Sequence, residues 1–405
     1  MTRVKGYLDS ADTRSTLGAV RALGGTIREL GADGDRIDLE LEGIGLRGPA
    51  PAAIDVGNAG TLLRILPGWL AGQSDGDWTL DGDDSIRRRP VDRIADPLRE
   101  MGAQISCRDE RLPPLEIHGA ALHGIEHRSD VASAQVKSCL LLAGLLAEGA
   151  TTVREPMPSR DHTERMMAAA GAEIERDGTA VSVSPTDRLD AGDVEVPGDF
   201  SSAAFPLVAA LLVPGSEIEL EKVGLNQTRI GLLSILARMG VPMSGAGSEE
   251  SAGLTVDQIG DAGPEPFGTL RARHSQLSGA EVRGNDVPLA IDELPLVALL
   301  GCFAEGETVV RDAAELRHKE SDRIAGVVDG LRGLGAEIEA TDDGFEVRGA
   351  GGLRGGSIDA RGDHRLAMLG AVAGLGSQEG VEVEGFEAVA VSYPSFERDL
   401  RSLLE

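Results

Sequence analysis

The chain repeats one pattern of apolar and polar positions along its length. An amphipathic helical segment ends in an apolar residue and a glycine, and an alternating, strand-like segment follows at once. Glycine just past a helix end can adopt the left-handed conformation that turns the chain into a strand. We call these segments the A helices. Five of them end at Gly24, Gly102, Gly171, Gly240 and Gly335, and a sixth is predicted at 395–404.

A second kind of helix, apolar around most of its surface, is predicted between the A helices. Most of these B helices are followed by glycine and a short alternating strand, such as 151–154. The repeating unit is therefore a B helix, a strand, an A helix and further strands. The predicted B helices are 58–70, 133–147, 201–213, 293–304 and 364–375.

This repeat predicts an α/β protein with two domains of three units each. Successive repeat glycines lie 69 to 95 residues apart, a spacing too long for an ordinary solenoid. The predicted domains are 1–196 and 197–405. Because there are six A helices but five B helices, the first unit is predicted to be incomplete. Its B helix and leading strand are either missing from the protein or encoded upstream of the assigned start.

Composition narrows the possible partners. The formal net charge of −28 disfavours nucleic acids and membrane surfaces, so anionic substrates would need a local basic pocket. The widely spaced Cys107, Cys139 and Cys302 show no disulfide or metal pattern and fit a reducing compartment. The chain has no apolar signal core and no apolar stretch long enough to span a bilayer, so we expect a cytoplasmic protein.

Predicted helix starts carry both capping residues and cations. Asn, Ser, Thr and Asp cap orphan backbone N–H groups, but capping does not explain the nearby cations. Helix N-termini favour anions, and guanidinium forks bind phosphate and carboxylate. A basic pocket for anions is therefore predicted from Arg64, Arg89, Arg160, Lys319, Arg323 and Arg365.

Three residues admit both a structural and a chemical interpretation. Lys137, in an apolar run, is either a snorkelling lysine or an anion ligand. Glu320, beside Lys319 and one turn before Arg323, is either a capping acid or a group tuned for proton transfer. Asp292 is either an N-cap or a carboxylate that takes a proton from a substrate hydroxyl.

Other familiar motifs are not supported. The glycine pattern at 43–48 is followed by Pro49 and Pro51, where a dinucleotide-binding fold would begin a helix. The sequence contains neither a Walker phosphate loop nor a His-Glu-x-x-His motif, and the scattered histidines suggest no metal site. His162 and His364 are interpreted as caps or anion contacts.

Together, these segments resemble the 3-phosphoshikimate 1-carboxyvinyltransferase (EPSP synthase) family over residues 5–405. Each is modest alone, but their order along the chain is highly specific. They are Leu8-Asp-Ser-Ala-Asp-Thr-Arg14, Gly57-Asn-Ala-Gly-Thr61 with Arg64, Arg88-Arg-Pro90, Ser133-Ala-Gln-Val-Lys137, Ser159-Arg-Asp-His-Thr163, Ile291-Asp-Glu-Leu-Pro295, Lys319-Glu-Ser-Asp-Arg323 and Asp363-His-Arg365.

The resemblance implies a fold and a reaction. The family fold has two domains, each built from three βαβαββ units as an inside-out α/β barrel. The family transfers the enolpyruvyl group of phosphoenolpyruvate to the 5-hydroxyl of shikimate 3-phosphate and releases phosphate, a step in chorismate and aromatic amino acid biosynthesis. It implies no metal or organic cofactor, two small-molecule substrates and a monomer.

The resemblance also implies roles for individual residues. Phosphoenolpyruvate would be held by Gly60, Arg89, Gln135, Arg323 and Arg365. Shikimate 3-phosphate would be held by Ser133, Gln135, Arg160, Asp292 and Lys319. Asp292 would accept the 5-hydroxyl proton, Glu320 would handle the proton at the methylene carbon, and Lys319 would complete the catalytic set. Supporting roles would fall to Asn58, Thr61, Arg64, Lys137 and His364.

Two departures from the family pattern bear on activity. The family begins with a Pro-Gly-Ser/Asp-Lys-Ser segment that binds both substrates, and the 405 residues do not contain it. Val391 stands where some members carry a phosphoenolpyruvate-binding lysine. The first departure predicts that this chain has weak or no activity.

Three alternative assignments fit the sequence less well. The sister enolpyruvyl transferase that acts on UDP-N-acetylglucosamine has a loop cysteine, which the region around 87–90 lacks, and does not have the Lys319–Arg323 motif. A non-catalytic anion-binding protein would not need Asp292 and Glu320 among its cations. An RNA-end-processing enzyme of similar repeat architecture conflicts with the net charge.

Overall fold

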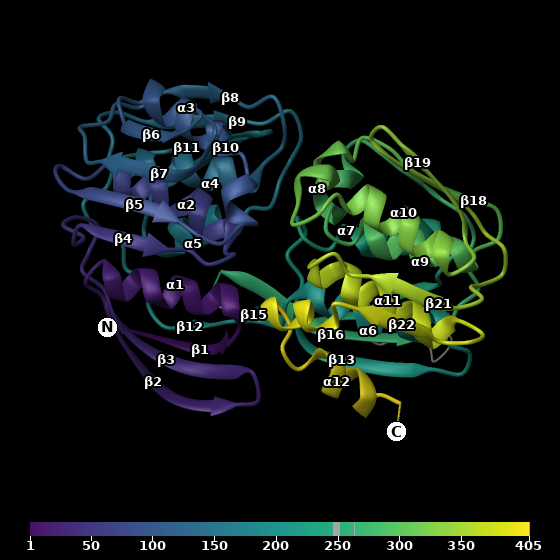
Figure 1. Cartoon of the computed structure of the whole chain (residues 1–405). Coiled ribbons are helices and arrows are strands. Elements are labelled where there is room, and N and C mark those ends of the chain that lie inside the picture. The colour runs from purple at the N-terminus through teal and green to yellow at the C-terminus, as the bar shows by residue number, and fades with distance from the viewer. Residues whose placement is uncertain (246–251, 263, 405) are drawn as a thin grey trace. The chain divides into compact units, whose positions relative to one another are not determined.

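The structure is a computed structural model that describes residues 1–245, 252–262 and 264–404. The chain divides into two compact units, Met1–Val196 and Pro197–Glu405, which we call unit 1 and unit 2 (Figure 1). These units have the same limits as the predicted domains, whose description as three repeat units each stays a prediction.

Unit 1 contains three four-stranded sheets. In each, one edge strand is parallel to its neighbour and the other pairs are antiparallel. The strands, in sheet order, are β12 (Val194–Glu195), β1 (Thr2–Leu8), β3 (Arg36–Glu42) and β2 (Thr26–Asp33); β4 (Ala52–Asp55), β5 (Asp77–Asp81), β7 (Leu112–His118) and β6 (Gln104–Arg108); and β8 (Glu126–Arg128), β9 (Thr151–Arg154), β11 (Ala180–Val183) and β10 (Ile174–Asp177).

In the part of unit 2 that the structure describes there are two four-stranded sheets and one two-stranded sheet. Their strands are β13 (Glu217–Gly224), β16 (Glu265–Arg273), β15 (Leu254–Ala262) and β14 (Met243–Gly245); β17 (Glu281–Val282), β18 (Glu307–Val310), β20 (Gly344–Arg348) and β19 (Glu337–Thr341); and β21 (Gly356–Asp359) with β22 (Val381–Glu384). Within the described residues, all six sheets of the two units are open and none closes into a barrel. The predicted repetition of α/β units is confirmed.

The helices follow the predicted order. The A helices are α1 (Ala11–Ala22), α3 (Asp92–Glu100), α5 (His162–Ala169), α7 (Gly231–Arg238), α10 (Arg323–Gly333) and α12 (Phe396–Ser402). The B helices are α2 (Gly60–Ala71), α4 (Ala134–Gly144), α6 (Phe200–Leu212), α9 (Leu294–Phe303) and α11 (His364–Gly376). Short additional helices, absent from the sequence prediction, are η1 (Ile86–Arg88), α8 (Asp286–Ala290), η2 (Ala314–His318) and η3 (Phe386–Val391).

The repeat glycines have the conformation that the sequence predicts. Gly24, Gly102, Gly171, Gly240 and Gly335 all have positive φ, at 103°, 99°, 97°, 87° and 97°. A side chain is strained there, so glycine lets each A helix turn directly into the next strand.

The B helices form the interior of each unit. In unit 2, α6, α9 and α11 pack against one another in pairs, and in unit 1, α2 packs on α4. The place of a leading strand beside β1 is taken by β12, which comes from the end of unit 1. The cores are mostly aliphatic, and Leu17 of α1 forms a small separate core with Ile37 and Leu39 of β3.

Candidate active site

Asp292, between α8 and α9, is surrounded by four cations from three separate segments of unit 2. Arg229 Nη1 donates to its Oδ2 at 3.1 Å, and Arg323 Nη1 donates to its Oδ1 at 3.3 Å. Lys319 Nζ lies 3.5 Å from Oδ1, and Arg365 Nη2 lies 3.8 Å from Oδ2. Asp292 is buried and is not the N-cap of α9, whose cap residue is Glu293. The capping interpretation of Asp292 is therefore wrong.

The Arg323 guanidinium joins three carboxylates. Besides Asp292, it donates to Glu320 at 2.5 Å and, through Nε, to Asp363 at 2.8 Å, and its side chain is only 1% exposed. Burial lowers the pKa of Arg323, but Asp363, Glu320 and Asp292 outweigh this and hold it above its ordinary value. Arg323 therefore remains charged and fixes two of the predicted catalytic acids around one group. Asp322, not Glu320, caps α10 by accepting from the Ala325 N–H.

Asp363 anchors the start of α11. It accepts from the Arg365 backbone N–H at 2.9 Å and from Ser321 Oγ at 3.0 Å, in addition to Arg323. Its complete burial raises its pKa, but the adjacent Arg323 guanidinium outweighs this and holds the pKa below the ordinary value. One ionised carboxylate thus fixes both arginines predicted to bind phosphoenolpyruvate in unit 2.

Arg365 reaches from α11 to the starts of α6 and α9. Its Nη1 donates to Ser201 Oγ at 2.6 Å and to the Asp292 backbone carbonyl at 3.2 Å. The Ser201 hydroxyl in turn donates to the fully buried Glu293. We define the unit-2 charged cluster as Asp199, Arg229, Asp292, Glu293, Lys319, Glu320, Arg323, Asp363 and Arg365.

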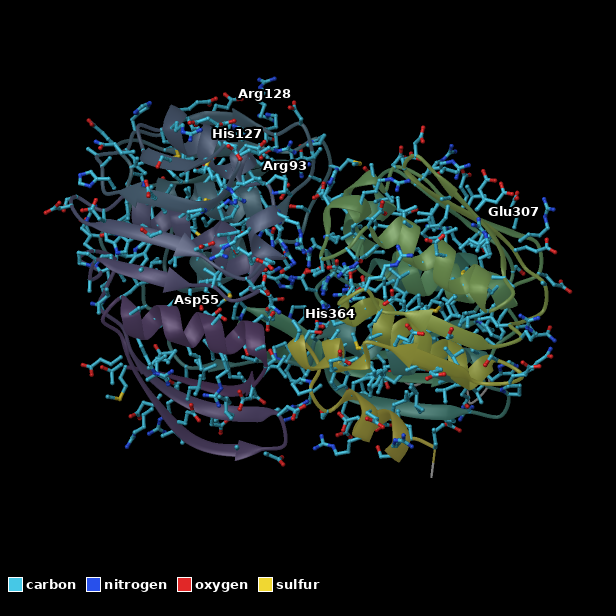
Figure 2. All side chains as sticks on the ribbon, in the orientation of Figure 1. Asp55, Arg93, His127, Arg128, Glu307 and His364 are labelled. Atoms are coloured by element: carbon cyan, nitrogen blue, oxygen red, sulfur yellow. The ribbon has the colours of Figure 1, made fainter. Side chains whose placement is uncertain are left out.

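His364, labelled in Figure 2, is the first residue of α11 and is half-buried. Burial, and after it the neighbouring Arg365 and Arg323, lower its pKa to about 4. The imidazole is therefore neutral near pH 7 and can act as a neutral hydrogen-bonding group.

In unit 1, the predicted site residues meet where α2, α3 and α4 begin. Arg64 Nη1 donates to Gln135 Oε1 at 2.8 Å, and Gln135 Nε2 donates to Thr61 Oγ1 at 3.2 Å. Arg89 is buried against Gly60, where a methyl group would lie 2.2 Å from Arg89 Nη1. We define the unit-1 polar cluster as Gly60, Thr61, Arg64, Arg89, Ser133 and Gln135.

Lys137 lies beneath this cluster, with its side chain 5% exposed. Its Nζ lies 2.9 Å from Glu155 Oε2 and 2.7 Å from Glu164 Oε1, so the snorkelling interpretation is wrong. Glu155 also accepts from the Ser133 backbone N–H at 2.8 Å and from Ser159 Oγ at 2.7 Å. Lys137 is thus a buried counter-ion that ties the start of α4 to the loop before α5.

The remaining predicted residues lie on the segments that lead into helices. Asn58 is in the turn before α2, where its carbonyl accepts from the Gly60 N–H at 2.9 Å. Arg160 is half-buried and directly follows Ser159 in the loop before α5. Ser133 caps α4 by accepting from the Val136 N–H at 3.4 Å, as the sequence predicts for helix starts.

Sequence reasoning missed Arg229 and most of the carboxylates that pair with the cations. The predicted basic pocket is, in unit 2, a network in which cations are already engaged by Asp199, Glu293 and Asp363 as well as by the predicted acids. A signal for Arg229 does exist: it lies two residues before α7, just as Arg160 lies two residues before α5.

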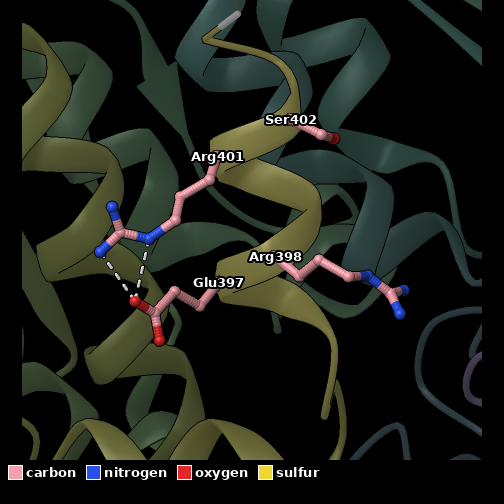
Figure 3. A pocket seen from close by; sticks show the side chains of 4 residues that line it. All are labelled: Glu397, Arg398, Arg401 and Ser402. Atoms are coloured by element: carbon pink, nitrogen blue, oxygen red, sulfur yellow. Dashed lines mark hydrogen bonds and ion pairs between the residues drawn. The ribbon is translucent and has the colours of Figure 1, made fainter.

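The structure also has a pocket that lacks the buried ion pairs of the candidate site. It lies on α12 and is lined by Glu397, Arg398, Arg401 and Ser402 (Figure 3). Glu397 and Arg401 form an ion pair of 2.8 Å one turn apart, and both side chains are more than half exposed. Such a pair is ordinary for a helix surface, and none of the predicted site residues lies there.

In residues 1–245, 252–262 and 264–404, no group of three or more His, Cys, Asp or Glu side chains is arranged to hold a metal ion. Across those same residues, every helix is too short or too polar to cross a bilayer.

A buried guanidinium that contacts two carboxylates at the helix starts of a repeated α/β fold favours an enzyme that acts on anionic substrates. The chain belongs to the EPSP synthase (3-phosphoshikimate 1-carboxyvinyltransferase) family, whose sequence profile matches residues 1–400. This membership excludes the UDP-N-acetylglucosamine and RNA-end alternatives.

Curated relatives share the family name. A 3-phosphoshikimate 1-carboxyvinyltransferase from Geobacillus kaustophilus is 48% identical over 407 residues, covering 100% of this chain and 92% of the relative. A second, from a Synechococcus strain, is 47% identical and covers 100% of this chain and 88% of the relative.

Solved structures agree with these relatives. EPSP synthase from Acinetobacter baumannii superposes with a TM-score of 0.82 at 40% identity, covering 99% of this chain and 89% of that one. The enolpyruvyl transferase NikO from Streptomyces tendae, at 18% identity and a TM-score of 0.76, shares the fold, with 99% of this chain and 88% of that one covered.

Proposed function

We propose that the unit-1 polar cluster and the unit-2 charged cluster bind the two substrates of the family reaction and carry out its proton transfers. As a member of the EPSP synthase family, the chain transfers the enolpyruvyl group of phosphoenolpyruvate to the 5-hydroxyl of shikimate 3-phosphate and releases phosphate, in aromatic amino acid biosynthesis. Each substrate carries phosphate and carboxylate groups, which guanidinium and ammonium groups recognise through charge-assisted hydrogen bonds.

Residues of both units are proposed as ligands for each substrate. In unit 1, Gly60, Arg89 and Gln135 contact phosphoenolpyruvate, while Ser133, Gln135 and Arg160 contact shikimate 3-phosphate. In unit 2, Arg323 and Arg365 contact phosphoenolpyruvate, while Asp292 and Lys319 contact shikimate 3-phosphate. Supporting roles fall to residues in or next to the two clusters: Asn58, Thr61, Arg64, Lys137 and His364.

The observation that carries the chemistry is that Asp292 and Glu320 contact the same Arg323 guanidinium. Glu320 delivers a proton to the methylene carbon of phosphoenolpyruvate, which leaves the adjacent carbon open to attack. Asp292 takes the proton of the 5-hydroxyl as that oxygen forms the new C–O bond, giving a tetrahedral intermediate. Loss of phosphate, which leaves with the proton held by Asp292, and return of a methyl proton to Glu320 then restore the double bond and both acids.

The cations must change partners for this to happen. Arg323 is engaged by three carboxylates, so a substrate carboxylate or phosphate has to replace at least one of them. Each exchange trades one charge-assisted bond for another, so the cluster can stay neutralised in the free enzyme and still bind anions. Removing either acid should therefore affect the chemical step more than substrate binding.

The test is phosphate release from the two substrates together. We expect Asp292→Asn and Glu320→Gln each to lower kcat by about 100-fold or more, the range for general acid–base groups. The matched control is Asp286→Asn on α8, which loosens an exposed ion pair with Arg238 of α7. Its kcat should stay within about twofold of the unmodified enzyme. An Asp292→Asn variant with near-normal kcat would contradict the proposal. Binding of both substrates without phosphate release by the unmodified chain would support the anion-binding alternative.

We further propose that the enzyme acts as a monomer in the cytoplasm. One chain supplies all the proposed ligands. Its three cysteines are free thiols, as expected in a reducing compartment. Burial raises the pKa of Cys139 and Cys302 to about 12, so both stay protonated and unreactive.

A further inference from the structure

Arg229 is the cation on Asp292 for which the substrate assignments provide no ligand. It lies just before α7 with its side chain 13% exposed. Its Nη1 donates to Asp292 Oδ2 at 3.1 Å and lies 4.0 Å from Glu293 Oε1, while its Nη2 donates to Asp199 at 3.4 Å. Burial lowers its pKa, but Glu293, Asp199 and Asp292 outweigh this and raise the pKa above its ordinary value.

The other three cations around Asp292 are also proposed substrate ligands. Lys319 is assigned to shikimate 3-phosphate, and Arg323 and Arg365 to phosphoenolpyruvate. When these anions bind, the three cations share their charge with phosphate and carboxylate oxygens. Their hold on Asp292 weakens at the moment when Asp292 has to be ionised to accept a proton.

We propose that Arg229 is a positioning residue that keeps Asp292 ionised and oriented while the substrates engage the other three cations. The inference rests on the proposed function, in which Asp292 accepts the 5-hydroxyl proton. Arg229 bonds Oδ2, whereas Lys319 and Arg323 approach Oδ1, so Arg229 fixes one oxygen of the carboxylate and leaves the other for the substrate.

The charges around Asp292 make the expected pH behaviour specific. The cations that face it are Arg229, Lys319, Arg323 and Arg365, and its sequence neighbour is Glu293. Three further carboxylates, Asp199, Glu320 and Asp363, share those guanidinium groups. Removing one positive charge from this set favours protonation of the carboxylates, so Asp292 would lose its ability to accept a proton first at low pH.

The experiment compares Arg229→Gln, Arg229→Lys and the unmodified enzyme in steady-state phosphate release over a range of pH. For Arg229→Gln we expect kcat to fall about tenfold or more near neutral pH, with a deeper loss as the pH is lowered. The KM of each substrate should change by less than about threefold, because Arg229 binds neither. Arg229→Lys keeps the charge and should recover part of the loss. The control is Arg238→Gln at the end of α7, which breaks an exposed ion pair with Asp286.

Several outcomes would overturn the inference. A loss of equal size at every pH, together with a lower unfolding temperature, would show that Arg229 is merely structural. A large rise in one KM at unchanged kcat would make it a substrate ligand. If Arg229 acts through Asp292, adding Arg229→Gln to Asp292→Asn should cause little further loss, so fully additive losses would also contradict it. An active Asp292→Asn variant would overturn the proposed function itself, whereas an inactive one alongside a pH-independent Arg229→Gln would overturn the inference about Arg229 alone.

Discussion

Gly60 and Arg89 lie so close together that any side chain at position 60 would displace the Arg89 guanidinium. A methyl group on Gly60 would be 2.2 Å from Arg89 Nη1, well inside contact distance. Gly60 is the first residue of α2, and Arg89 follows η1, so residues 29 positions apart in sequence share one space. Glycine at this helix start therefore determines where the Arg89 guanidinium can lie.

Gly60→Ala should impair phosphoenolpyruvate binding without unfolding unit 1. The obstructed atom is the far end of a flexible side chain, which can move aside, so we expect the free energy of unfolding to change by less than about 1 kcal/mol. Because Arg89 is a proposed phosphoenolpyruvate ligand, its displacement should raise the KM for phosphoenolpyruvate several-fold and leave the KM for shikimate 3-phosphate nearly unchanged. Steady-state kinetics with each substrate varied in turn would measure this. Equal rises in both KM values would contradict it.

Gly68→Ala, two turns further along α2, should instead destabilise unit 1. A methyl group there would lie 1.9 Å from the backbone carbonyl oxygen of Cys139 on α4, so the two helices would have to separate. Overpacking of this kind costs about 1–3 kcal/mol, and backbone displacement places it at the upper end. Urea unfolding of Gly68→Ala and Gly60→Ala in parallel would test the contrast. Equal stabilities of the two variants would show that α2 and α4 can move apart at little cost.

Lys137→Met should strongly destabilise unit 1. The variant leaves Glu155 buried without its cation and Glu164 paired only with the exposed Arg176, and breaking a buried pair in this way costs about 3–5 kcal/mol. Adding Glu155→Gln and Glu164→Gln removes the excess buried negative charge and should recover much of the loss. Urea unfolding of the single and triple variants is the measurement, with Lys222→Met on an exposed lysine as the control. A triple variant less stable than Lys137→Met would contradict the electrostatic explanation.

The fold could be predicted from the sequence because its signals are local. Each repeat glycine, such as Gly102 or Gly335, marks a helix end and a strand start within a few residues, and the apolar runs identify the B helices. Helix ends were predicted less accurately: the predicted B helix 133–147 ends at Gly144. The contact of Gly144 with Thr151 and Val183, which leaves no room for a side chain, also could not be read from the sequence.

The candidate site was predictable only in part because its partners are far apart in sequence. Cations near helix starts could be recognised one by one, and Asp292 and Glu320 could be recognised from their motifs. Pairing could not be read from the chain: Arg229 meets Asp292 across 63 residues, and Lys137 is enclosed by two glutamates that no local pattern links to it. Which cations are already neutralised is therefore a property of the fold rather than of the sequence pattern.

His364 should make stability depend on pH between about 4 and 6.5. In the unfolded chain a histidine takes up a proton near pH 6.5, whereas burial, Arg365 and Arg323 lower the pKa of His364 in the folded protein to about 4. As the pH falls through this window, the unfolded state binds a proton that the folded state does not, so stability is lost. His364→Gln removes this dependence, and its free energy of unfolding relative to the unmodified enzyme should rise on acidification by up to about 3 kcal/mol. Urea unfolding of both proteins at several pH values would measure the difference. A constant offset between them would mean that His364 titrates alike in the folded and unfolded chain.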